Sequence, residues 1–117
     1  MNDYDKIKEA AEALIQARTE LKAQNNVLTT LEQQLMELKS AKIYDSTQYV
    51  NTIDGIVALK SSMDALRESN LIYSTTIRDC YDELARIIPE SLDDVEIHIS
   101  ISHYVIRSNG FVSVIEN

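Results

Sequence analysis

Five large apolar residues spaced seven apart constrain this chain more than any other feature of its sequence. They are Ile7, Leu14, Leu21, Leu28 and Leu35. Three residues after each of them come Ala10, Ala17, Gln24, Leu31 and Leu38. This heptad spacing, with mostly apolar a and d positions, is typical of a helix that packs a narrow seam against another helix. We predict a first helix over about residues 3–42.

The second half of the chain repeats this spacing. Its a positions are Ile56, Met63, Asn70, Ile77 and Leu84, and its d positions are Leu59, Leu66, Tyr73, Cys80 and Ile87. Asp45 and Gln48 have the spacing of a helix N-terminal capping box, and Pro89 disfavours helical geometry at the residue before it. We therefore predict a turn at about residues 42–46 and a second helix over about residues 46–88.

The helices show two features that suggest more than one neighbour. Additional apolar residues, among them Val50, Ile53 and Val57, broaden the stripe of the second helix beyond its seam. Gln24 is a polar seam residue, which either fixes register and oligomer state or turns its amide to solvent. A lone helical hairpin buries little surface. We expect a homo-oligomer, a dimer or higher with a four-helix dimer favoured, and interface residues that include Leu28, Met63 and Asn70.

After Pro89 the apolar period changes to two. Val95, Ile97, Ile99 and Ile101 alternate with polar residues, which indicates a half-buried strand. Asn109-Gly110 is typical of a type I′ hairpin turn, and it would pair Ser108 with Phe111 and Tyr104 with Ile115. This hairpin ends at Asn117, and it leaves no apparent partner for the first strand. We therefore predict that Ile97, Ile99 and Ile101 pair with, or pack against, a second copy.

The predicted fold is mainly α. A long antiparallel, coiled-coil-like helical hairpin (residues 1–90) is followed by a small C-terminal β-strand and β-hairpin element (residues 91–117). The layout resembles that of prefoldin subunits in having a long antiparallel helical hairpin near this length. In prefoldin the β-hairpin lies between the helices, whereas here the strands follow both, so the resemblance implies a shared architecture and no function.

Composition disfavours several classes of function. The net charge of −8 and the pI of about 4.6 disfavour binding to nucleic acid through a basic face. Cys80 is the only cysteine, which excludes a disulfide framework and a multi-cysteine zinc site within one chain. No apolar run approaches the ~20 residues that a membrane span needs. Because no basic-then-apolar leader follows Met1, we expect a cytoplasmic protein.

No catalytic motif is evident in the sequence. There is no Gly-rich phosphate loop, no HExxH and no Ser-His-Asp signature. We therefore expect no enzymatic activity, no catalytic residue, no cofactor and no metal. Cys80 falls on a seam position, where a small core residue is the favoured interpretation over a nucleophile.

Four residues of the C-terminal element are candidates for binding a ligand or partner: His98, His103, Tyr104 and Arg107. The histidines can bind a metal or titrate with pH, although a surface or interface role is favoured. Arg107 is the only basic residue after Arg86. It can anchor an anion, or it can pair with Glu116 or with a carboxylate of a neighbouring chain, and the salt bridge is favoured.

Two classes of function fit these features. The first is a non-enzymatic structural, assembly or adaptor protein, such as a scaffold or a chaperone-like module, with a protein partner. The alternative is a small inhibitor or sequestering protein, of the kind that phages encode, that binds a host protein or a small anionic ligand.

Overall fold

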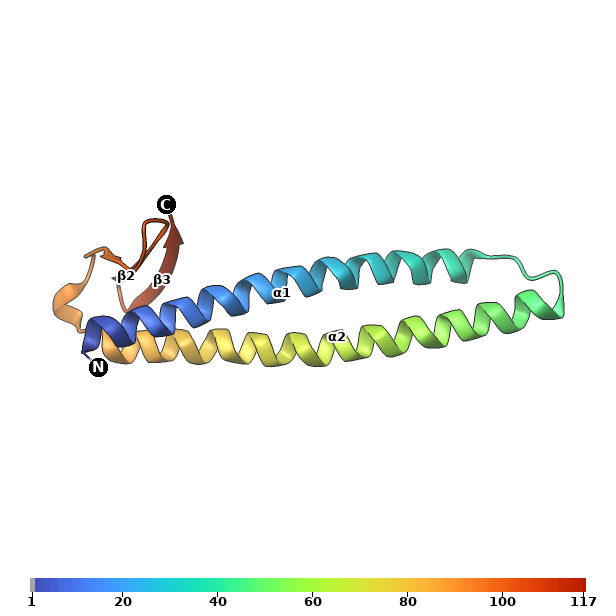
Figure 1. Ribbon diagram of the computed structural model, residues 1–117, viewed down its shortest axis with the longest axis horizontal. Helices are drawn as coiled ribbons and strands as arrows, with labels where there is room; N and C mark the ends of the chain where they lie inside the picture. Colours follow the sequence, from blue (N-terminus) through green and yellow to red (C-terminus); the bar gives the residue numbers. More distant parts are fainter. Residues whose placement is uncertain (1) are drawn as a thin grey trace. The chain divides into compact units, whose positions relative to one another are not determined.

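The computed structural model describes residues 2–117 and contains two long helices followed by a small sheet (Figure 1). The helices are α1 (Asp3–Ser40) and α2 (Ser46–Ile87). A short 3-10 helix, η1 (Glu90–Leu92), leads to strands β1 (Ile97–His98), β2 (His103–Ser108) and β3 (Phe111–Glu116). The predicted fold class, an antiparallel helical hairpin followed by a C-terminal β element, is confirmed.

The chain divides into two compact units. The sheet unit combines the residues up to Glu20 with Tyr73–Asn117, and the hairpin unit is Leu21–Ile72. This division crosses the sequence-based boundary between residues 90 and 91, because the sheet shares one core with the helix segments of its unit.

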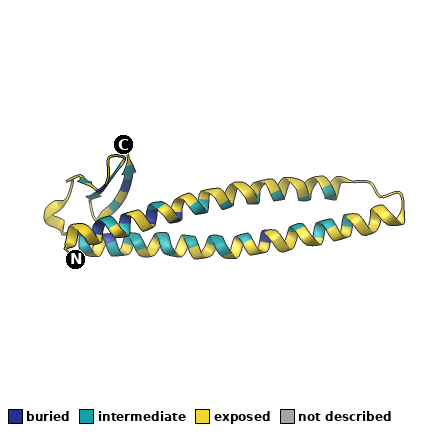
Figure 2. Ribbon diagram, in the orientation of Figure 1, coloured by how far each residue is buried: buried dark blue, intermediate teal, exposed yellow. Residues whose placement is uncertain are grey.

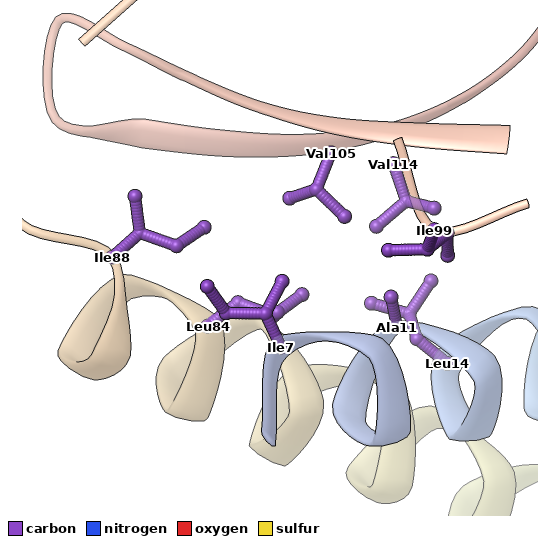
Figure 3. Packing of buried hydrophobic residues seen from close by; sticks show 8 residues of the cluster. All are labelled: Ile7, Ala11, Leu14, Leu84, Ile88, Ile99, Val105 and Val114. Carbon is purple, nitrogen blue, oxygen red and sulfur yellow. The ribbon is translucent and has the colours of Figure 1, made fainter. Parts of the chain in front are cut away.

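The core of the sheet unit lies between the sheet and the two helix segments (Figure 3). Its buried members come from α1, from the end of α2 and from the strand region: Ile7, Ala11, Leu14, Leu84, Ile88, Ile99, Val105 and Val114. Figure 2 shows buried positions along these same segments. One face of the sheet is therefore sealed by the helices.

The hairpin unit is held by a narrow seam. Its heptad a and d residues are half-buried, Met63 is buried, and most residues outside the seam are exposed. Near the turn, a Cβ on Gly55 would lie 3.0 Å from Leu38 Cδ1, so the missing side chain lets the two helices approach closely. The start of α2 is capped as predicted, because Asp45 Oδ1 accepts the Gln48 amide at 2.8 Å.

The β2–β3 hairpin has the register predicted from its turn. Asn109 (φ 53°) and Gly110 (φ 80°) both have positive φ, as a type I′ turn requires. Ser108 pairs with Phe111 and Tyr104 pairs with Ile115. The two-residue turn therefore determined the pairing of both strands.

The prediction that the first strand lacks a partner in its own chain is wrong. β1 is short, and it pairs antiparallel with β2, with Ile97 opposite Val105. The prediction overlooked the second edge of β2, since β3 occupies only one. Ile99 is buried in the core of its own chain, which removes the reason for assigning Ile97 and Ile99 to a second copy. Contact of Ile97, Ile99 or Ile101 with another copy stays a prediction.

Candidate interaction site

Arg107 lies on the helix-facing side of β2 and caps the end of α2. Its Nη1 donates to the carbonyl of Ala85 at 3.2 Å and also to the carbonyl of Ile88. The last carbonyls of a helix have no partner within the helix, and Pro89 prevents the helix from continuing. The guanidinium supplies the missing donors, and its positive charge suits the negative end of the helix dipole.

Two carboxylates complete the surroundings of Arg107. Asp93 Oδ1 lies 3.4 Å from its Nε and Glu90 Oε1 lies 3.9 Å from its Nη2. The Nε contact is not aligned for a hydrogen bond, so this pair is electrostatic only. The Arg107 side chain is 14% exposed. The carboxylates beside Arg107 are therefore those of Asp93 and Glu90, not that of Glu116. Contact of Arg107 with a ligand or partner stays a prediction.

His98 and Tyr104 are brought together on the opposite side of the sheet. They are paired across β1 and β2, and their ring centroids lie 5.2 Å apart. His98 Nε2 lies 3.0 Å from Glu96 Oε1, and the Tyr4 hydroxyl donates to the His98 carbonyl at 2.7 Å. Alternation along β2 separates this pair from His103 and Arg107. The four candidate residues therefore do not form a single site.

The outer face of the sheet carries large apolar side chains. Val105 and Val114 point into the core, so their strand neighbours point away from it (Figure 3). We define the outer face as Tyr104, Ile106, Phe111 and Ile115. Phe111 is 79% exposed and the other three are half-buried. An exposed apolar group on a sheet face, such as Phe111 here, is typical of a surface that meets another molecule.

The loop between β1 and β2 holds one isoleucine fully in solvent. Ser100 Oγ accepts the backbone amides of Ser102 at 3.3 Å and His103 at 3.1 Å. Asn117 binds the loop from the other side, since its Nδ2 donates to the Ile101 carbonyl at 2.9 Å. Ile101, between these contacts, is 99% exposed. A large apolar side chain on a well-braced turn is preorganised for contact with a partner.

His103 forms a polar pair that resembles part of a catalytic arrangement. Its Nδ1 lies 2.8 Å from the Ser102 hydroxyl. Glu116 faces His103 across the β2–β3 ladder, yet no ion pair joins them in the part of the chain described, residues 2–117. A serine nucleophile requires a base that a third group orients and a site for the developing oxyanion. The pair alone meets neither requirement.

A shallow groove of about 400 Å³ lies between the helix segments of the sheet unit. Small side chains, including Ala10, Ala13 and Cys80, line it, with Asp79 and Glu83 at its border. Burial raises the pKa of the Cys80 thiol, and the charge of Asp79 adds to this effect. Cys80 packs against the core as predicted, and the raised pKa disfavours its reactive thiolate.

The hairpin unit contains a polar layer that joins the two helices, formed by Gln24, Asn25, Ser69 and Asn70. Gln24 Nε2 donates to Ser69 Oγ at 3.0 Å, and Asn70 Nδ2 donates to Asn25 Oδ1 at 2.8 Å. The two polar seam positions therefore meet at one level. Gln24 Oε1 and Asn70 Oδ1 are buried without a hydrogen bond among residues 2–117. The layer costs stability but penalises any shift of one helix along the other.

Three predicted interface residues lie along the seam of the hairpin unit. Leu28 is half-buried and Met63 is buried within a single chain, and Asn70 belongs to the polar layer. Their own chain accounts for this burial. Contact of these residues with a second copy stays a prediction.

Across residues 2–117, no three His, Cys, Asp or Glu side chains gather in a way that would hold a metal ion. In the same range no helix is long and apolar enough to cross a membrane. No family model, curated protein or solved structure matches this chain.

Proposed function

We propose that this chain is a non-enzymatic, cytoplasmic assembly or adaptor protein. Its helices form a homo-oligomer, and the outer face of its sheet, with Ile101, contacts a protein partner. The proposal follows from what the molecule exposes, and no catalytic arrangement competes with it among the described residues.

The accessible surface carries this proposal. The chain exposes 7927 Å² at 13.3 kDa. A folded monomer of that mass exposes about 6,500 Å², so the chain exposes about 1,400 Å² more than expected. A standard protein interface buries about 800 Å² on each partner. The excess is therefore large enough for an interface of that size with a second copy, with area left for another protein.

Light scattering on the purified chain tests the assembly part of the proposal. At micromolar concentration we expect a mass of at least twice 13.3 kDa, which falls on dilution if the oligomer dissociates. A mass near 13.3 kDa throughout this range would overturn it.

Capture from the native host with matched variants tests the adaptor part. Ile101→Asp removes the exposed isoleucine of the braced loop without touching the core. We expect it to lose a protein that the unchanged chain retains, while its own oligomer persists. The control is Ile43→Asp, which changes an exposed isoleucine of the hairpin unit. An identical set of captured proteins for Ile101→Asp and the unchanged chain would contradict an adaptor role for this loop.

The alternative is an inhibitor or sequestering protein that binds a host protein or a small anionic ligand, and Arg107 is one candidate anchor for such an anion. Its guanidinium already contacts two carbonyls and two carboxylates of its own chain, which disfavours it as an anion anchor. A host protein as the target stays compatible with the adaptor surface, and the same capture experiment would identify it.

A further inference from the structure

One face of α2 in the hairpin unit carries exposed residues in a regular stripe. Their spacing alternates between three and four, which keeps them on one side of a helix. The α2 stripe consists of Val50, Ile53, Val57, Lys60, Asp64, Arg67 and Leu71. It lies beside the a and d seam that faces α1, at heptad positions b and e.

The α2 stripe is apolar at both ends and charged in the middle. Val50, Ile53, Val57 and Leu71 are all exposed large apolar residues, with 62% exposure for Val57 and 68% for Leu71. A solvent-facing helix surface ordinarily carries polar side chains, so exposed aliphatic residues in register are typical of a helix that packs against a further helix.

The order of charges makes the stripe complementary to itself in one orientation. Three pairs of stripe residues lie at equal sequence distances on either side of residue 62: Lys60 and Asp64, Val57 and Arg67, and Ile53 and Leu71. In an antiparallel pair centred there, Lys60 faces Asp64 of the other copy and Ile53 faces its Leu71. A parallel pair in register would set like charges against each other at Lys60 and at Asp64, which is unfavourable.

Arg67 fits the same arrangement. Within its own chain, Arg67 Nη1 lies 3.4 Å from Asp64 Oδ1, and Arg67 Nη2 lies 3.9 Å from Glu32 Oε1. These contacts hold its charged end close to its own chain. The aliphatic stem of an arginine readily covers an apolar side chain, so it can pack on Val57 of the second copy.

We propose that the α2 stripe is the self-association surface of this protein, covered by the same stripe of a second copy in antiparallel orientation. The inference rests on the proposed function, since it requires a homo-oligomer, and it adds the surface, the orientation and the register. The area is compatible with a second copy as the occupant, because the exposed excess of about 1,400 Å² per chain is larger than the roughly 800 Å² that a standard interface buries on each partner.

Two valines of the hairpin unit provide a matched test. Val57 lies in the stripe and Val27 lies on α1 outside it, and they are 62% and 50% exposed. Val57→Glu should convert the dimer to a monomer in sedimentation velocity at micromolar concentration, with helicity retained in circular dichroism. Val27→Glu should leave the dimer intact. Equal behaviour of the two variants would overturn the stripe as the interface.

Charge reversal tests the antiparallel register and does not depend on a core residue. Lys60→Glu and Asp64→Lys should each raise the dissociation constant roughly tenfold, because each sets like charges against each other across the interface. The double variant exchanges the charges and should lower the dissociation constant below that of either single variant. The recovery should be incomplete, because Asp64 also pairs with Arg67 of its own chain. A double variant that dissociates like the single variants would overturn the antiparallel pairing.

The outcomes separate this inference from the proposed function. If the unchanged chain is a dimer and Val57→Glu is also a dimer, self-assembly survives and the α2 stripe is rejected as its surface. If the unchanged chain is a monomer, the homo-oligomer of the proposed function and the stripe as its surface are both rejected. This holds even if another protein is found to occupy the stripe.

Discussion

Replacing Arg107 by methionine distinguishes a structural arginine from a ligand anchor. Methionine keeps an unbranched apolar stem and removes the guanidinium. The carbonyls of Ala85 and Ile88 then lose their donor at the end of α2, beside a proline that supplies none. The connection between β2 and the helix should loosen, and the protein should lose stability.

The magnitude follows from the contacts. A hydrogen bond from a charged donor contributes about 1.5–3 kcal/mol, and here one nitrogen serves two carbonyls that water can partly rehydrate. The pairs with Asp93 and Glu90 add little, because these carboxylates are 39% and 88% exposed and solvent screens them. We expect a loss of about 2–3 kcal/mol in the free energy of unfolding. For a domain of this size that lowers the melting temperature by roughly 8–12 °C.

Thermal and urea unfolding at a fixed protein concentration would measure this loss. The control is Arg78→Met. The Arg78 side chain is 71% exposed and forms an ion pair with its neighbour Asp79, so its loss should cost under about 0.5 kcal/mol. Equal shifts for the two variants would refute the capping role. So would a melting temperature that inorganic phosphate raises in the unchanged chain and not in Arg107→Met, since that result would identify an anion site.

Three further experiments, two with variants and one with a thiol reagent, test other parts of the structure. Leu28→Ala should lower the free energy of unfolding by about 1–2 kcal/mol, which is at the low end for a leucine because Leu28 is only half-buried. The control, Gln33→Ala, changes an exposed residue and should cost under about 0.5 kcal/mol. Equal urea midpoints for the two variants would mean that the seam register is wrong. Cys80, whose pKa is raised, should react with a thiol reagent at pH 8 more slowly than free cysteine does, and an equal rate in the folded protein would contradict its burial. Gly110→Ala should lower the free energy of unfolding by about 1 kcal/mol, because φ at Gly110 is 80° and alanine is strained there. An added Cβ would meet no neighbouring atom within 4 Å, so strain is the only cost. An unchanged thermal midpoint would argue against the type I′ turn.

The parts of the fold that the sequence predicted well depend on local rules. The heptads placed both helices to within two residues at each end, because seam spacing and the Asp45 cap act over short distances. Asn109-Gly110 determined the register of β2 and β3, because a type I′ turn, with positive φ at both residues, joins two strands through a two-residue loop.

The parts that the sequence predicted poorly depend on choices between competing partners. The alternation of Ile99 and Ile101 suggested one continuous strand, but the Ser100 hydroxyl binds two backbone amides and turns the chain between them. Such side-chain bonds compete with a strand ladder. Several carboxylates were candidate partners for Arg107 in the sequence. Only the folded geometry shows that its guanidinium donates to carbonyls at the end of α2.

The two units also differ in the sequence separation of the residues that they join. The polar layer joins residues 45 apart in sequence, whereas Arg18 donates to the carbonyl of Val114 across 96 residues. Closing a longer loop costs more entropy, so we expect the contacts of the hairpin unit to form before the sheet packs on the helices. During synthesis, Ile7 and Leu14 leave the ribosome long before Val105 and Val114 exist to cover them. For most of its translation the nascent chain therefore lacks the strands that cover this apolar surface.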